Sequence, residues 1–188
     1  RLPGNDMVQA AVFIATSVDG FIARPDGGLD WLPEGGGFEG EDYGYDAFIK
    51  SIDAIIMGRH SFEKVCEFPE WPYRKPVIVL TSRSRLKAPH PEVEIETMRG
   101  APGEILSTLE KQGIRSVYVD GGKTIQQFLD AGVVNRLIVT RIPVLIGQGI
   151  PLFGPLTHDI VLEHVVTRSW PSGLTQSEYV VRDSHSRR

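Results

Sequence analysis

The segment from Ser116 to Gly132 constrains the fold of this chain more than any other. From Ser116 to Asp120 β-branched and aromatic side chains alternate, Gly121 and Gly122 interrupt the run, and apolar residues then recur at helical spacing up to Gly132. This pattern predicts a strand, a glycine turn and a helix. Two glycines at such a turn let a phosphate approach the free N–H groups of the helix. A phosphate site is therefore one interpretation, and a tight turn that binds nothing is the other.

The composition is that of an ordinary soluble domain. Hydrophobic residues make up 41% of the 188 positions, charged residues 23%, and the net charge is -4. Without an excess of Lys and Arg, a nucleic-acid partner is not expected. The single cysteine, Cys66, cannot form an internal disulfide and no apolar run has membrane-spanning length, so we expect a cytoplasmic protein with no membrane association. We expect one domain over residues 7–183, between flexible tails at 1–6 and 184–188.

Apolar runs predict the rest of the architecture. The run from Val8 to Thr16 is almost continuously apolar, as in a central strand that is covered on both faces. From Asn135 onward, extended runs joined through 171–173 predict an antiparallel hairpin. The expected fold class is α/β, with a three-layer α/β/α arrangement around a mixed sheet that ends in this hairpin. The other expected elements are strands at 53–57, 76–82 and 116–120, an edge strand at 93–96, and helices at 59–66 and 102–112.

The long segment between Arg24 and Asp46 is rich in glycine and carries scattered aromatic residues. A loop of this length inside a compact domain is usually a lid or a binding loop, and a disordered connector is the alternative. Trp31, Leu32 and Phe38 favour a lid, because they indicate closure onto an apolar surface.

Three predicted strands are followed by a hydroxyl and a cation. In an open α/β sheet, ligands bind beyond the carboxyl ends of the parallel strands. Arg59 and Lys123 are expected in the first turns of helices, where a positive charge opposes the macrodipole and a bound anion would reverse that penalty. The alternative is that each cation simply points into water. An extended, phosphate-rich cofactor fits the three strand ends, which are Gly58-Arg59-His60-Ser61, Thr81-Ser82-Arg83 and Gly121-Gly122-Lys123-Thr124.

Several other kinds of site lack their sequence pattern. A Walker-type phosphate loop needs a glycine five positions before Gly122, where this chain has Val117. The five histidines and Cys66 show no metal-ligand spacing, so no metal is expected. No Gly-x-Ser-x-Gly elbow supports a serine hydrolase.

Six blocks, taken in order, resemble the dihydrofolate reductase-like fold: SVDGFIA, GGLDWL, DAIIMGRHSFE, VIVLTSR, VYVDGGKTIQQFLDAG and VNRLIVTRIPVLIGQGIPLF. They are more similar still to the branch that contains the reductase domain of the bifunctional riboflavin-biosynthesis deaminase-reductase. Phe13 stands where those reductases usually have a lysine, and Gly58-Arg59-His60-Ser61 stands where they usually have a Gly-Ala-Gly-Thr-like turn. A pteridine, a ribosylaminopyrimidine and another small carbonyl or imine compound therefore remain open as substrates.

The resemblance implies an NADPH-dependent reductase of a small heterocyclic substrate. A nucleotide-binding module that keeps the cofactor cleft without catalysis is the alternative from another class. The resemblance also points to a homodimer, as does the apolar length of the terminal strands and of IPVLIGQGIPLF. On the matching positions, the pyrophosphate would be held by Gly121, Gly122, Thr124 and Ser61, and the adenosine 2′-phosphate by Arg59, Ser82, Arg83 and Lys123. Ala15 and Ile22 would flank the nicotinamide, Gly58 and Thr81 complete the cofactor set, and Leu29, Trp31 and Phe48 would contact the substrate.

Reduction of a C=N or C=O bond also needs a proton. Counting back from Met57-Gly58-Arg59, the position that matches the acidic residue of dihydrofolate reductases is Asp42, and Asp46 lies one turn later. We expect Asp42 rather than Asp46 to serve. Enclosure beside Trp31 and Phe48 would raise the pKa of Asp42 and make it an acid. The alternative role is that of a helix N-cap.

Overall fold

The computed structural model describes residues 7–33 and 40–182. The expected tails at 1–6 and 184–188, and Phe38 of the expected lid, lie outside the described residues. The helices are α1 (Tyr45–Lys50), α2 (Arg59–Cys66), α3 (Pro102–Lys111) and α4 (Gly122–Asp130). The strands are β1 (Gln9–Ser17), β2 (Phe21–Ala23), β3 (Ala54–Gly58), β4 (Val77–Leu80), β5 (Ile95–Met98), β6 (Ser116–Asp120), β7 (Arg136–Ile142), β8 (Ile150–Pro151), β9 (Leu162–Ser169) and β10 (Thr175–Val181).

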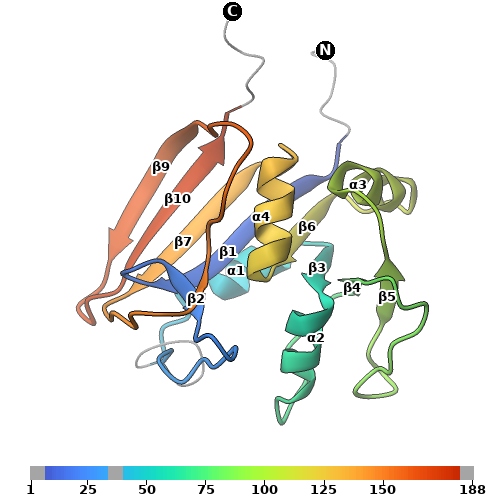
Figure 1. Ribbon diagram of the computed structural model, residues 1–188, viewed down its shortest axis with the longest axis horizontal. Helices are drawn as coiled ribbons and strands as arrows, with labels where there is room; N and C mark the ends of the chain where they lie inside the picture. The colour runs from blue at the N-terminus through green and yellow to red at the C-terminus, as the bar shows by residue number, and fades with distance from the viewer. Residues whose placement is uncertain (1–6, 34–39, 183–188) are drawn as a thin grey trace, which may run out of the picture.

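Eight strands form one sheet in the order β5-β4-β3-β6-β1-β7-β10-β9, and β2 pairs with β8 in a small second sheet (Figure 1). The pairs from β5 to β7 are parallel, whereas β10 runs antiparallel to both β7 and β9. The mixed sheet and its C-terminal hairpin are thus confirmed. Since β1 lies between β6 and β7, the first strand of the chain is a central one, as its continuous apolar run predicts.

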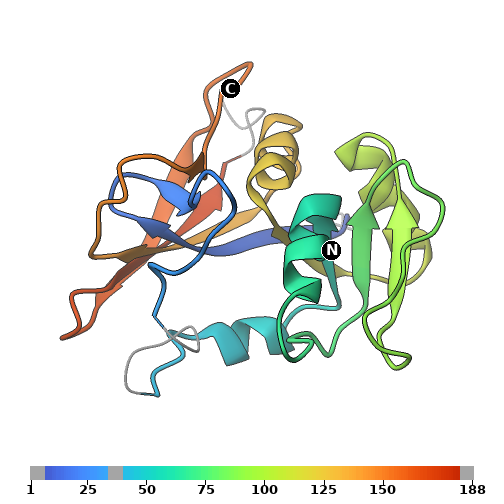
Figure 2. The ribbon, with the colours of Figure 1, turned by 60° about the horizontal axis from the view of Figure 1, so that its bottom comes forward.

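Helices cover both faces of this sheet, which confirms the three-layer arrangement. On one face, α3 and α4 pack against alternate residues of β1, β3 and β6, such as Val12, Ile56 and Val119. On the other face, α1 and α2 pack against the intervening residues, such as Ala11, Ile55 and Tyr118. Figure 2 shows α1 and α4 on opposite sides of β1. This alternation follows from the two-residue period of a strand.

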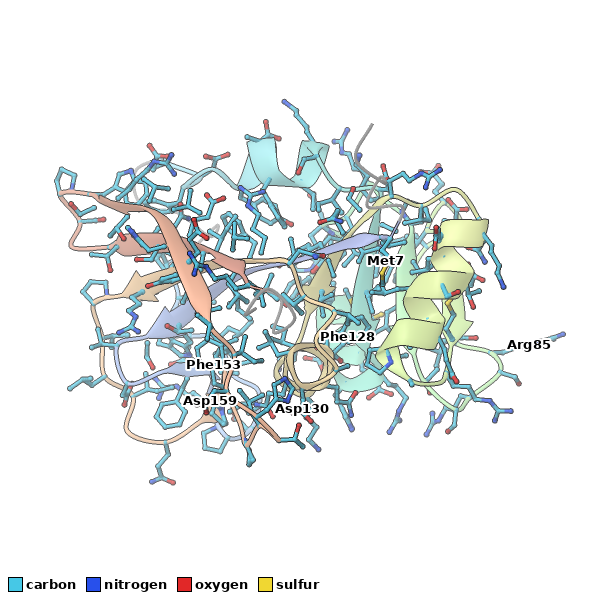
Figure 3. All side chains as sticks on the ribbon, turned by 90° about the horizontal axis from the view of Figure 1, so that it is seen from above. Met7, Arg85, Phe128, Asp130, Phe153 and Asp159 are labelled. Carbon is cyan, nitrogen blue, oxygen red and sulfur yellow. The ribbon has the colours of Figure 1, made fainter. Side chains whose placement is uncertain are left out.

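The helix α4 owes its position to the apolar spacing seen in the sequence. Its residues Ile125, Phe128 and Leu129 are all buried against the sheet, and Phe128 lies on the inner side of the helix in Figure 3. The edge strand begins two residues later than expected, because Val93 donates its N–H to the carbonyl oxygen of His90 in a turn, 3.1 Å away. Within the part of the chain that the structure describes, no helix is long and apolar enough to cross a membrane.

Candidate active site

The three strand ends that the sequence singles out are neighbours in space. Strands β4, β3 and β6 lie side by side and are parallel, so their carboxyl ends share one edge of the sheet. Helix α2 begins directly after β3, and α4 begins directly after Gly121 at the end of β6. The structure therefore brings the three predicted segments to one edge, where an extended ligand could reach all of them.

The glycine turn after β6 leaves no room for side chains. Gly121 has φ +92°, and a Cβ atom there would collide with Ser61 Oγ. A Cβ atom on Gly122 would lie 3.0 Å from Ile22 Cδ1. The predicted residues Ser61, Ile22, Gly121 and Gly122 are thus in close proximity, and Gly58 joins them, since its Cβ position is 3.1 Å from Thr124 Oγ1. We refer to these six residues as the glycine cradle.

The start of α4 faces this cradle without a side-chain cap. No side chain of the described residues accepts a hydrogen bond from the first N–H groups of the helix. Uncapped N–H groups beside backbone that carries no side chains suit an anionic oxygen, since the helix dipole favours negative charge there.

The predicted cations differ in their surroundings. The Arg59 guanidinium is half-buried and forms an ion pair with Glu63, with Nη1 and Oε1 3.1 Å apart. Arg83 and Lys123 are exposed and form no ion pair within residues 7–33 and 40–182. Thr81 holds the turn before them, because its Oγ1 accepts the N–H of Arg83 at 3.1 Å. Arg83 and Lys123 are therefore available to bind a phosphate, and so is the exposed hydroxyl of Ser82.

A cavity of about 270 Å³ opens on the α1 side of the sheet, at the carboxyl ends of β1 and β7. Of the predicted residues, Ala15 and Asp42 line it, whereas Leu29, Trp31 and Phe48 do not. Trp31 packs behind the cavity with Tyr43 and Leu174, and Phe48 stacks on Phe13 with ring centroids 4.9 Å apart. The full lining is Phe13, Ala15, Leu32, Pro33, Asp42, Tyr43, Tyr45, Thr140, Ile142 and Leu174.

Asp42 lies two residues before Gly44, the N-cap of α1, so it does not occupy the N-cap position that was its alternative role. Its carboxylate accepts the N–H groups of Gly44 and Asp46, each at 3.0 Å, just before and within the first turn of α1. These hydrogen bonds lower the pKa of Asp42, and the residue is exposed. The raised pKa expected from enclosure is therefore wrong. Asp46 is also exposed and forms an ion pair with Lys50 at 2.8 Å. Whether either carboxylate takes part in catalysis stays a prediction.

A different carboxyl group has the properties expected of an acid. Asp120, the last residue of β6, accepts the N–H of Gly121 at 2.9 Å and the O–H of Tyr73 at 3.4 Å. Burial raises the pKa of Asp120. Burial and the Asp120 charge also raise the pKa of Tyr45, which lines the cavity, to about 12. Asp120 thus contacts Gly121 of the glycine cradle and acts through its charge on Tyr45 of the cavity lining.

Asp120 is absent from the site residues that the sequence predicts. Its signal was an acidic residue at the carboxyl end of a strand, directly before two glycines. Nothing in the sequence placed Tyr73 and Tyr45 near it. Burial raises the pKa of this carboxyl and outweighs the hydrogen bonds from Gly121 and Tyr73, which lower it. Among the described residues, no three His, Cys, Asp or Glu side chains gather as a metal site would require.

Comparison with known proteins identifies the family. Residues 10–174 match the RibD C-terminal domain. The chain belongs to the RibD C-terminal domain family. Its sequence is 30% identical over 175 residues to the uncharacterized protein YwjB of Bacillus subtilis (strain 168), a match that covers 92% of this chain and 97% of YwjB. The predicted resemblance to this branch is confirmed.

Two solved structures extend this RibD C-terminal domain relationship. A protein of Shewanella sp. PV-4 that is named for riboflavin biosynthesis is 34% identical and superposes with a TM-score of 0.84, over 94% of this chain and 100% of that one. Dihydrofolate reductase from Enterococcus faecalis, solved with NADP(H), is 22% identical and has a TM-score of 0.64, over 93% of this chain and 97% of that one. The second similarity shows that the fold is dihydrofolate reductase-like.

Proposed function

We propose that this protein is an oxidoreductase that uses NADPH to reduce a small heterocyclic compound of the pteridine or ribosylaminopyrimidine type, as in riboflavin or folate metabolism. The observation that carries the proposal is the glycine cradle at the carboxyl end of β6, together with the cavity at the carboxyl end of the neighbouring parallel strand β1. Hydride transfer requires that the cofactor and the substrate be bound close to each other. Membership of the RibD C-terminal domain family supports the same activity.

The residues of the cradle suit the phosphates of the cofactor. Gly121 and Gly122 present bare backbone where a side chain would collide with Ser61 or Ile22, so a pyrophosphate would be held by these two glycines with Ser61 and Thr124. Arg83, Lys123 and Arg59 would hold the adenosine 2′-phosphate, with Ser82 and Thr81 beside them. NADPH supplies the hydride when bound.

The proton would come from the group formed by Asp120, Tyr73 and Tyr45. A carboxyl with a raised pKa keeps its proton closer to neutral pH than an exposed aspartate does. Tyr73 and Tyr45 hold their own protons, because burial and the Asp120 charge raise the pKa of both phenols. We assign Asp120 the role of proton reservoir near Tyr45, which lines the cavity.

NADPH should bind much more tightly than NADH, because the two cofactors differ in one phosphate and Arg59, Arg83 and Lys123 are placed to surround it. Charge-assisted hydrogen bonds contribute roughly 1.5–3 kcal/mol each, so Arg59→Ala should weaken NADPH binding about tenfold or more. Titration calorimetry with both cofactors measures this. Arg85→Ala is the matched control, because Arg85 is exposed and points away from the sheet in Figure 3. Equal affinity for NADPH and NADH would refute the cofactor assignment.

The activity itself is tested by oxidation of NADPH against a panel of pterins and pyrimidines. Turnover with any member establishes a reductase. Tight NADPH binding with no oxidation across the panel would favour the non-catalytic nucleotide-binding module instead.

We also propose a homodimer that forms through the terminal strands. Phe153 and Val165 are 51% and 52% exposed, although both are large and apolar. Phe153 and Leu162 border a groove of about 440 Å³ on the outer strands. A second copy that covers this surface would remove an exposed apolar patch.

The dimer is expected in light scattering at micromolar concentration, and Phe153→Arg should shift the protein to a monomer, since a buried unpaired charge opposes association. Val18→Arg is the control, because Val18 is 49% exposed and lies in the turn between β1 and β2. A wild-type monomer would contradict the proposal.

A further inference from the structure

We propose that the cavity beside Ala15 binds an uncharged, flat ring compound, and that the substrate is recognised without a phosphate group. This inference rests on the proposed reductase function and adds the chemical class of the substrate. It follows from the shape of the cavity, from its charge, and from the neutral polar groups that line it.

The walls of the cavity are largely aromatic and aliphatic. Phe13 and Tyr45 meet edge to face, with ring centroids 5.6 Å apart, and Phe48 stacks on Phe13 from behind. Rings that are fixed by other rings in this way form a rigid wall on which a flat molecule can lie. The volume of about 270 Å³ is near the lower end of ligand pockets, which span roughly 300–1,000 Å³. A single or fused ring therefore fits better than a ring that carries a sugar phosphate.

The charge of the cavity disfavours an anion. Among the described residues, no Lys, Arg or His lines it, and Asp42 is its one charged side chain. Hydrogen bonds lower the pKa of Asp42, so this carboxylate is ionised at neutral pH. A phosphate ester carries about −1.5 to −2 charges, so it would meet a like charge here without the Arg or Lys that usually binds it.

The polar groups that remain are neutral. Thr140 Oγ1 accepts a hydrogen bond from Gln176 Nε2 at 3.0 Å, which leaves the Thr140 hydroxyl hydrogen free to turn toward the cavity. Gln176 is itself fixed, since Nε2 also donates to the carbonyl oxygen of Tyr43 at 2.9 Å. The Tyr45 phenol keeps its proton, because its pKa is raised to about 12. Two hydroxyl groups suit ring carbonyls and ring nitrogens.

A neighbouring groove contains arginines that could bind a phosphate. It shares Phe13 and Tyr43 with the cavity and includes Arg136 and Arg168. Arg136 is already compensated, because its Nε lies 2.6 Å from Glu178 Oε1. Arg168 is exposed on β9. The experiment therefore includes a variant at Arg168.

The test compares two pairs of compounds that differ by one phosphate: 7,8-dihydroneopterin with its 3′-phosphate, and 5-amino-6-(ribosylamino)uracil with its 5′-phosphate. Calorimetry on the wild-type protein saturated with NADP⁺ gives each affinity without turnover. We expect the phosphate-free member of each pair to bind at least as tightly as its ester. An ester that binds more tightly in either pair would overturn the inference, and loss of that advantage in Arg168→Ala would place the phosphate in the neighbouring groove.

A second measurement uses the cavity wall. Phe13→Lys places a cation beside the ring site, and Phe13→Leu is the matched control without a charge. We compare the ratio of the ester's affinity to the affinity of its phosphate-free partner in the two variants. This ratio should be about tenfold higher in Phe13→Lys than in Phe13→Leu, which corresponds to about 1.4 kcal/mol. If this affinity ratio is equal in the two variants, the absence of a cation does not cause the preference for the phosphate-free compound. NADPH affinity is measured separately, so failure of cofactor binding refutes the reductase, whereas normal cofactor binding with ester preference refutes only the substrate class.

Discussion

Gly121→Ala should reduce NADPH affinity about a hundredfold or more, which corresponds to at least about 2.7 kcal/mol. Gly121 has φ +92°, and its missing side chain makes room for Ser61 Oγ. Alanine there adds backbone strain of roughly 1–3 kcal/mol. Its Cβ also collides with Ser61 Oγ, so the Ser61 side chain must turn away from the place where the pyrophosphate is proposed to bind. Titration calorimetry with NADPH measures the loss, and thermal unfolding reports the strain.

Gly132→Ala separates the effect of backbone strain at a positive φ from the effect of a collision with Ser61. Gly132 also has a positive φ, +72°, but nothing lies within 4 Å of the position that its Cβ would take. Gly132→Ala should therefore lower stability, as Gly121→Ala does, while NADPH affinity stays at the wild-type value. If both variants bind NADPH normally, the glycine cradle is a tight turn and not the phosphate site.

Asp120→Asn should lower turnover by about 10²–10⁴-fold, the usual contribution of general acid–base catalysis. The substitution keeps the shape of the side chain and removes its titratable proton. Affinity for NADPH should change little. Rates measured with the substrate that the panel identifies decide the matter, and the pH profile adds a second readout. Wild-type turnover should fall as pH rises through the pKa of Asp120, and the asparagine variant should lose that dependence.

Stability provides the control for Asp120→Asn. Burial raises the pKa of Asp120 above its ordinary value of 3.8. A raised carboxyl pKa favours folding at low pH, and this contribution is lost as pH rises through the folded-state pKa. At pH 7 the asparagine variant should thus be at least as stable as the wild type, so a loss of turnover would not reflect unfolding. A clearly less stable variant would indicate a structural role instead.

Asp42→Asn and Asp46→Asn belong in the same assay. Asp42 has a lowered pKa and is engaged with two backbone N–H groups, so its loss should reduce turnover less than tenfold. Asp46 pairs with Lys50 at the surface and should have no effect. Loss of most turnover in Asp42→Asn, with normal turnover in Asp120→Asn, would restore Asp42 as the proton donor.

The sequence was informative where structure is local. The turn after β6, the helix that follows it and the order of the strand ends all depend on spacing within short segments, and the structure agrees with each. The acid was harder to find, because the pKa of a carboxyl depends on what packs around it. Tyr73 comes from the connection between α2 and β4, and Tyr45 comes from α1. No short-range pattern brings these phenols to the end of β6.

The cavity lining had the same difficulty. Asp42 lines the cavity, yet it is exposed and accepts a hydrogen bond from the first turn of α1. Alignment of its position with the acidic residue of dihydrofolate reductases could not reveal this combination. Trp31 and Phe48 lie one layer behind the surface that they were expected to form. Apolar residue types predicted an apolar site, but which of them reach the cavity depends on how α1 docks.

The central position of β1 has a consequence for synthesis of the chain on the ribosome. This strand is made before both of its partners among the described residues, β6 and β7, and its Ala10 N–H donates to the Asn135 side chain, 125 positions later in the chain. Contacts between residues so far apart in the sequence form slowly, because closing a long loop costs conformational entropy before the contacts can stabilise the fold. The nascent chain must therefore carry an unpaired, apolar strand until β6 and β7 have emerged. We expect slow refolding and a need for chaperones that bind extended apolar segments.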